Sequence, residues 1–237
     1  MSVAESVIGV ILPPADAPVP PEAKLLYPHG VEFLAEGLAF RGMTIESYDE
    51  AVPRILPAAL RLKERGATAI SIMGTSLTFY KGAAFNLELI DRVRQATGLP
   101  TTSMSSGIVD GLTVAGAQRI AVATAYSDIV NAAFERFLKE SGFEGLTMRG
   151  LNLFRATNAV TQEQLSNFSA DVFAAAPGAD TLLIACGGLS TIDLLVPLEA
   201  KCTVPVVSST PHALMNAVRL VGLSPRAMGY GSVLAKA

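Results

Sequence analysis

Two stretches of this sequence decide the fold: Ile70-Ser71-Ile72-Met73-Gly74-Thr75-Ser76-Leu77 and Leu182-Leu183-Ile184-Ala185-Cys186-Gly187-Gly188-Leu189. Each is an apolar run that ends in small residues, which is typical of a buried strand that runs into a tight turn. The two turns, at Gly74 and Cys186, lie 112 residues apart. This spacing indicates an internal repeat.

Two further pairs of segments support the repeat. Pro14 and Tyr126 each follow an apolar run and are also 112 residues apart. The segment Leu99-Pro100-Thr101-Thr102-Ser103 is echoed by Val204-Pro205-Val206-Val207-Ser208. Repeated spacing of this kind predicts two similar α/β halves that face each other.

Strands and helices alternate along the chain. The predicted strands are Val7–Leu12, Ala67–Met73, Pro100–Ser103, Arg119–Thr124, Thr181–Ala185 and Val204–Val207, with a further one at Val31–Leu38. Helical periodicity covers Tyr48–Arg65, Gly82–Ala96, Asp128–Glu140, Gln162–Ala175, Thr191–Glu199 and Pro211–Leu220. Pro53 and Pro57 predict a kink or a later start for the first of these helices.

The alternation predicts an α/β fold of two pseudo-symmetric domains, each a mainly parallel sheet flanked by helices. We expect the first domain to comprise residues 1–115 and 209–237, and the second residues 116–208. Ligands of such sheets bind beyond the carboxyl ends of the strands. The repeat therefore predicts one site, in the cleft between the domains, near Pro14, Gly74, Tyr126 and Cys186.

Composition excludes several classes of protein. The 237 residues are 50% hydrophobic and 16% charged, but no apolar run approaches the roughly 20 residues of a membrane helix. The first 14 residues lack the basic region of a signal peptide. The net charge is -3 without a basic block, so we expect neither a nucleic-acid nor a membrane partner. We expect a cytoplasmic protein, a monomer or small homo-oligomer.

Ionisable groups suited to catalysis are few. The chain has two cysteines, Cys186 and Cys202, and two histidines, His29 and His212. Neither number supports a disulfide scaffold, a zinc site or a serine–histidine triad, and no nucleotide-binding motif is present. We therefore expect no metal and no cofactor. Cys202 is expected to be structural, and both histidines to lie on the surface or at helix starts.

The two turns suit an anion. Small residues and hydroxyls at Gly74-Thr75-Ser76, at a predicted helix start, favour a carboxylate, and the Tyr126 hydroxyl could donate to it. A thiol at Cys186, beside Gly187 and a helix start, is expected to have a lowered pKa. The alternative is structural: two ordinary strand-to-helix turns, a packing tyrosine and a buried cysteine.

The sequence resembles the arylmalonate decarboxylases, within a superfamily that includes aspartate/glutamate racemases and maleate cis-trans isomerase. The resemblance covers most of the chain, from Gly9 to about Gly231, and is weakest between Gly142 and Phe168. It is carried by Gly74–Asn86, Ala96–Pro100, Ala123–Tyr126, Cys186–Leu189 and Pro205–Ser209. The racemases use one cysteine in each half, whereas here the first-half position is Gly74.

The resemblance implies a cofactor-free carboxy-lyase that acts on a small dicarboxylate, an α-aryl or alkenyl malonate. One carboxylate would be held by Thr75, Ser76 and Tyr126 with backbone N–H groups near Cys186 and Gly187. After loss of CO2, Cys186 as a neutral thiol would protonate the enediolate from one face, giving a single enantiomer.

The other carboxylate would lie against apolar residues. This pocket is predicted to comprise Pro13, Pro14, Phe40, Met43, Met73 and Leu77, with a contribution from residues 154–159. Phe40 and Met43 are bulkier than the Leu and Val of the family pattern, which predicts a smaller pocket or an altered substrate range. Residues 154–159 depart from the pattern.

Two other functions remain open at this point. The shared fold and the matching turns fit a racemase or isomerase that uses one cysteine with a second base. The donor-rich turns alone fit a carboxylate-binding protein without catalytic activity. Glycine rather than cysteine at position 74 favours the decarboxylase, because a two-base racemase needs an acid or base on each face of the carbon.

Overall fold

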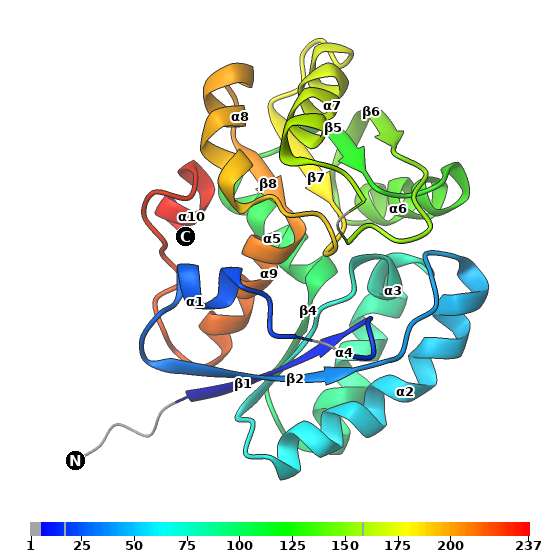
Figure 1. Ribbon diagram of the computed structural model, residues 1–237, viewed down its shortest axis with the longest axis vertical. Coiled ribbons are helices and arrows are strands. Elements are labelled where there is room, and N and C mark those ends of the chain that lie inside the picture. Colours follow the sequence, from blue (N-terminus) through cyan, green and yellow to red (C-terminus); the bar gives the residue numbers. More distant parts are fainter. Residues whose placement is uncertain (1–5, 17, 158) are drawn as a thin grey trace.

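A computed structural model describes residues 6–16, 18–157 and 159–237 and consists of two α/β halves (Figure 1). Each half contains a four-stranded parallel sheet. The strands are β1 (Ser6–Leu12), β2 (Val31–Gly37), β3 (Ala69–Ile72), β4 (Thr101–Ser103), β5 (Arg119–Thr124), β6 (Glu144–Gly150), β7 (Thr181–Ala185) and β8 (Val206–Ser208).

Helices cover the sheets and fill the space between the halves. They are α1 (Glu22–Leu26), α2 (Ile45–Glu64), α3 (Thr75–Phe79), α4 (Ala83–Thr97), α5 (Met104–Ala115), α6 (Asp128–Glu140), α7 (Gln162–Ala174), the 3-10 helix η1 (Ile192–Leu194), α8 (Leu195–Cys202), α9 (Ser209–Leu220) and α10 (Ser232–Lys236). No helix in these described ranges combines the length and the apolar character needed to cross a membrane.

The internal repeat is confirmed by the topology of the two sheets. Their strand orders are β2-β1-β3-β4 and β6-β5-β7-β8, which are the same arrangement. The central strands β3 and β7 are buried along their whole length, as both-face coverage by helices requires. Gly74 and Cys186 therefore follow equivalent strands, two residues after β3 and one after β7.

Besides short helices such as α1 and α10, two longer elements escaped prediction. The strand β6 lies at a sheet edge, is only partly buried and carries charged residues, so it lacks an apolar signal. The helix α5 contains Gly107 and Gly111, which lower helix propensity. The reason for both glycines is close packing: a Cβ at Gly107 would lie 2.6 Å from the Ala213 Cα, and one at Gly111 2.7 Å from the His212 Cδ2.

The helix α2 contradicts the expected later start. It begins at Ile45, where the Thr44 hydroxyl accepts a hydrogen bond from the Ser47 N–H, and it continues through Pro53 and Pro57. Each proline removes one intrahelical hydrogen bond. The helix tolerates this because one face, which includes Ile55 and Leu62, is buried against the core.

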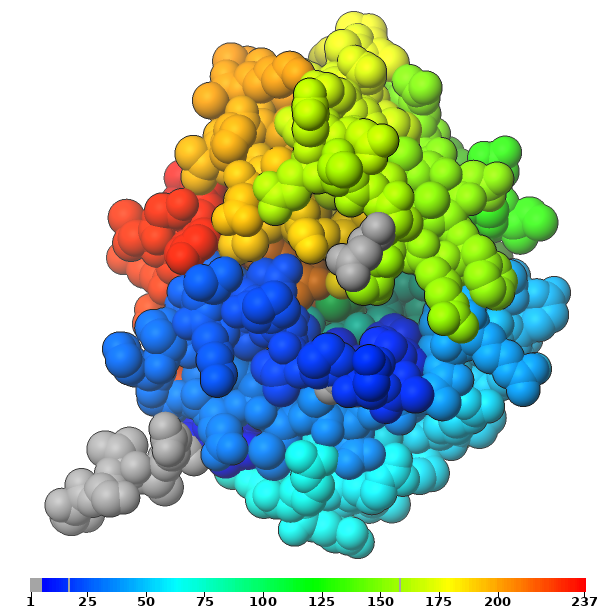
Figure 2. Space-filling view, in the orientation of Figure 1, coloured from blue at the N-terminus to red at the C-terminus, as the bar shows by residue number. Residues whose placement is uncertain are grey.

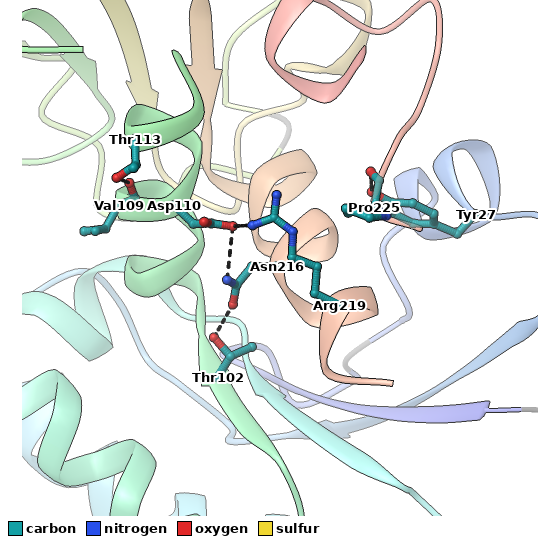
Figure 3. Close-up of polar contacts among 8 residues, drawn as sticks. All are labelled: Tyr27, Thr102, Val109, Asp110, Thr113, Asn216, Arg219 and Pro225. Atoms are coloured by element: carbon teal, nitrogen blue, oxygen red, sulfur yellow. Dashed lines mark hydrogen bonds and ion pairs between the residues drawn. The ribbon is translucent and has the colours of Figure 1, made fainter. Parts of the chain in front are cut away.

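The helix α9 ties the C-terminal part of the chain back to the first half. It follows β8 of the second sheet and packs on α5. Figure 3 shows the polar contacts: the Arg219 guanidinium pairs with the Asp110 carboxylate at 2.5 Å, and Asn216 joins Asp110 to Thr102. These contacts favour the proposed assignment of residues 209–237 to the first domain, which stays a prediction.

His212 lies at the start of α9, as expected, but it is fully buried and not on the surface. Its Nδ1 lies 2.9 Å from the Ser208 carbonyl oxygen and 3.1 Å from the Ser208 nitrogen. Burial lowers the pKa of its imidazole to about 4, since desolvation disfavours the charged form. The other histidine, His29, is exposed.

This pKa makes the stability of the fold depend on pH. The unfolded chain binds a proton at His212 below about pH 6.5, whereas the folded chain does so only near pH 4. The stability contributed by the neutral ring is therefore present above pH 6.5 and is lost as pH falls to 4, by about 3 kcal/mol. Denaturant unfolding should show that the wild type loses free energy of unfolding between pH 7 and pH 4.5. This loss should be smaller in His212→Leu and equal to that of the wild type in His29→Gln. An equal loss in His212→Leu would contradict the assignment.

Candidate active site

The predicted site residues converge at the carboxyl ends of the strands, between the two sheets. Thr75 and Ser76 follow β3, Tyr126 follows β5, and Cys186 follows β7. All four side chains are at most 8% exposed. In Figure 2 the surface is hollowed between the blue N-terminal segment and the yellow-green residues of the second half.

Cys186 occupies an unusual backbone position. Its φ of 149° lies in the region that favours glycine, and a residue with a side chain adopts it at a cost of about 1–3 kcal/mol. Its N–H donates to the Ser209 Oγ at 3.0 Å, and its thiol donates to the Met43 Sδ at 3.7 Å. Strain of this kind is commonly retained at functional sites.

The expected lowering of the Cys186 pKa is wrong. Burial raises the pKa of the thiol to about 11, and the Gly188 backbone and the Tyr126 hydroxyl offset only part of this effect. No helix begins at this turn, because residues 187 and 188 form a turn and η1 starts only at Ile192. The thiol is therefore protonated at neutral pH, the form that a proton donor needs.

Gly74 lies at the equivalent turn of the first half, where α3 begins. Its φ of −129° suits any residue, so backbone conformation does not require glycine. A Cβ there would lie 3.1 Å from the Leu77 Cβ and 3.3 Å from the Pro13 Cγ. Its surroundings are thus apolar, and position 74 supplies no acid or base.

The polar side of the site has unused donors. The hydroxyls of Tyr126 and Tyr48 are buried and have no hydrogen-bond partner. Burial raises the pKa of both phenols, and for Tyr126 the nearby Cys186 and Tyr48 raise it further. Both hydroxyls therefore keep their protons. Because these two phenols lie next to the other site residues, a polar ligand is expected beside them.

Thr75 adds a third donor. Its hydroxyl has one hydrogen and two neighbouring acceptors, the Met104 Sδ at 2.8 Å and the Ser209 Oγ at 3.1 Å. It also lies close enough to Tyr126 to affect the pKa of that phenol. Because α3 is only five residues long, side-chain hydroxyls rather than a helix dipole supply the attraction for an anion.

The apolar side is assembled from both halves. The Phe40 ring stacks on Tyr48 with centroids 5.6 Å apart, and Met43 reaches the Cys186 thiol. The Met43 N–H donates to the Phe154 carbonyl at 3.0 Å. The contribution of residues 154–159 to the pocket stays a prediction, and residue 158 lies outside the described residues.

The remaining predicted pocket residues differ in burial. Met73 is buried and directly precedes Gly74. Pro13 is half-buried beside Gly74, whereas Pro14 is exposed and its carbonyl oxygen faces Gly37. The place of Pro14 in the pocket therefore stays a prediction. Gly187 lies beside Met104, whose Sδ would be 3.0 Å from a Cβ at that glycine.

Three residues of the site were missed: Tyr48, Met104 and Ser209. Tyr48 stands in the first turns of a helix, where nothing distinguishes it from a packing tyrosine. Met104 and Ser209 directly follow the repeated segments that end at Ser103 and Ser208. Extending that repeat by one residue would have found both, and both contact the Thr75 hydroxyl.

No three His, Cys, Asp or Glu side chains come together to hold a metal ion within the described ranges. Cys202, which we expect to be structural, ends α8 and is buried. The polar groups that the described site residues supply are hydroxyls and one protonated thiol.

The model of one protein family, arylmalonate decarboxylase, matches residues 8–234. The chain belongs to this family. It is also 42% identical over 227 residues to the arylmalonate decarboxylase of Bordetella bronchiseptica, a match that covers 94% of each protein. The predicted resemblance is thereby confirmed, and the chain is a carboxy-lyase of the arylmalonate decarboxylase family.

Solved structures agree with the fold of this family member. A liganded arylmalonate decarboxylase variant, with one glycine changed to cysteine and one cysteine to serine, superposes with a TM-score of 0.93 at 41% identity, covering 96% of this chain and 98% of that one. The maleate isomerase of Pseudomonas putida S16 gives a TM-score of 0.87 at 18% identity, covering 97% and 98%. This second match shows a shared fold of two α/β domains.

Proposed function

We propose that this carboxy-lyase decarboxylates α-aryl or alkenyl malonates without a cofactor and gives a single enantiomer of the monocarboxylic acid. The observation that carries the proposal is the asymmetry of the cleft. A buried thiol with a pKa of about 11 stands at the end of β7, and Gly74 stands at the equivalent place after β3. Only one face can deliver a proton.

The retained carboxylate binds on the polar side. The hydroxyls of Thr75, Ser76 and Tyr126 donate to it, and the unpartnered Tyr48 hydroxyl provides a further donor. When the bond to the second carboxylate breaks, its electron pair moves through the α-carbon into the retained carboxylate, which becomes an enediolate. Donors preset around that charge stabilise it, and removing one of them raises the barrier by about 3 kcal/mol.

The departing carboxylate lies on the apolar side, near Met43, Leu77 and Pro13. A charged group is poorly solvated there, and its loss as neutral CO2 removes the charge from that environment. Phe40 stacked on Tyr48 narrows this side. We therefore propose a preference for substrates whose second α-substituent is small.

The proton balance closes with one thiol. Cys186 transfers its proton to the planar α-carbon, which leaves a thiolate and the monocarboxylate product. The thiolate then takes a proton from water. A racemase would need a second acid or base on the Gly74 face, and the side chains nearest that face, Leu77 and Pro13, cannot provide one.

The test is incubation of the purified protein with phenylmalonate, followed by CO2 release and phenylacetate formation. 2-Methyl-2-phenylmalonate should give one enantiomer of 2-phenylpropionate. The same protein should not exchange the α-hydrogen of aspartate, glutamate or 2-phenylpropionate in D2O. Rapid exchange would favour a racemase, and tight malonate binding without turnover would favour a carboxylate-binding protein.

The rate should depend on pH through the Cys186 thiol. The proton donor is the neutral thiol, which is fully present below its pKa of about 11 and is lost as pH rises through that value. An ordinary cysteine would lose its proton near pH 8.5. We therefore expect kcat for phenylmalonate to stay level from pH 8 to 10, with folding checked by circular dichroism. A decline with a midpoint near pH 8.5 would contradict a buried, neutral donor.

A further inference from the structure

Ser209 joins the two sides of the site. It is 1% exposed and is the first residue of α9, the helix that runs from the second sheet back to the first half. Its Oγ accepts hydrogen bonds from the Cys186 N–H at 3.0 Å and from the Thr75 hydroxyl at 3.1 Å. One oxygen thus contacts both the residue that carries the thiol and a residue that faces the carboxylate.

The bond to Cys186 stabilises a costly backbone conformation. With φ at 149°, the Cys186 N–H donates to the Ser209 Oγ. Without that oxygen, the buried amide would have no strong acceptor. Conformations of this kind persist only where the surroundings determine them. Removing the Ser209 oxygen should therefore loosen the turn that aims the thiol.

The hydrogen bond to Ser209 holds the Thr75 hydroxyl in position before substrate binds. The single hydrogen of Thr75 is directed to Ser209 or to the Met104 thioether, of which the thioether is the weaker acceptor. A substrate carboxylate is a stronger acceptor than either neutral atom. The hydrogen can therefore turn to the substrate while the Thr75 side chain keeps its place.

We propose that Ser209 is a positioning residue that fixes the Cys186 thiol relative to the Thr75 hydroxyl and thereby confines proton delivery to one face. This inference rests on the proposed decarboxylation. Met104, at the equivalent place after β4, cannot act in the same way, because its sulfur is a weak acceptor and the Cys186 N–H donates to Ser209 instead.

The kinetic test compares Ser209→Ala with Ser209→Thr, which keeps the oxygen. With 2-methyl-2-phenylmalonate, Ser209→Ala should lower kcat about thirtyfold, change KM less than threefold and lower the enantiomeric excess. Ser209→Thr should restore at least a third of kcat and most of the enantiomeric excess. Ser71→Ala, which removes a buried hydroxyl of β3 without a partner, is the matched control and should behave as the wild type.

The contrary outcomes are equally distinct. Unchanged enantiomeric excess in Ser209→Ala, or Ser209→Thr no better than Ser209→Ala, would overturn the positioning role. If Ser209→Ala does not fold, Ser209→Cys keeps the size of the side chain but is a weak acceptor, and the same losses are expected of it.

An amide-exchange measurement separates this proposal from the decarboxylation. Labelling with 15N-cysteine gives two amide signals, Cys186 and Cys202, since the chain has two cysteines. In Ser209→Ala the Cys186 amide should exchange with D2O about tenfold faster, while the Cys202 amide, within α8, is unchanged. An inactive wild type with this exchange pattern would reject the decarboxylation alone, and unchanged exchange at Cys186 would reject the role of Ser209.

Discussion

Replacing Cys186 with alanine should lower the rate of phenylacetate formation from phenylmalonate about a thousandfold. A positioned general acid contributes typically 10²–10⁴-fold to a rate, and Cys186 is the only acid that the proposed mechanism uses. The buried thiol carries its proton at neutral pH. Without it, the enediolate must wait for a proton from water, which the buried site largely excludes.

Cys202→Ala is the matched control for this experiment. Cys202 is the second buried cysteine and ends α8, whereas the site residues follow strands β3, β5 and β7. We expect Cys202→Ala to keep the wild-type kcat. Product formation that survives undiminished in Cys186→Ala would contradict the protonation role, whereas equal losses in both variants would indicate a general effect on folding.

Replacing Tyr126 with phenylalanine should lower kcat about 10²–10³-fold, the usual cost of removing one donor from a developing negative charge. The same change should raise the free energy of unfolding by about 1 kcal/mol. The Tyr126 hydroxyl is buried without a partner in the free protein, and such a group is a cost to the folded state. Loss of activity with a gain in stability would show that the hydroxyl is kept for a ligand.

Tyr27→Phe provides the opposite case. The Tyr27 hydroxyl donates to the Pro225 carbonyl at 2.7 Å, 198 positions further along the chain (Figure 3). Its removal should cost about 1 kcal/mol of stability and leave kcat unchanged. Thermal unfolding gives the stability of each variant, and steady-state kinetics give its kcat. A loss of stability in Tyr126→Phe would contradict the unpartnered state of the Tyr126 hydroxyl.

The bulk of Phe40 and Met43 on the apolar side should affect which substrates the protein accepts. Phe40 lies flat on Tyr48, and Met43 contacts the thiol that must reach the α-carbon. Bulk at both positions leaves less room on the apolar side than Leu and Val would. A substrate panel that varies the second α-substituent from hydrogen to ethyl would therefore report on these two side chains directly.

The local signals in the sequence were sufficient for the central part of the fold. Continuous apolar strands such as β3 and β7 are read from neighbouring residues alone, because burial on both faces leaves an uninterrupted apolar run. Elements whose signal is not local were missed. The glycines of α5 argue against a helix until the close approach of α9 explains them, and β6 at the sheet edge has no apolar run.

By itself the sequence determined the two-half repeat, the pairing of Gly74 with Cys186, and the presence of Thr75, Ser76 and Tyr126 at strand ends. These features follow from the separation of residues along the sequence, which can be counted without knowledge of the fold. The protonation state of Cys186 was decided by the tertiary structure, since burial by distant residues raises the pKa that the local turn alone was expected to lower. The contact of Ser209 with both halves was decided there too, because it joins residues 23 and 134 positions away.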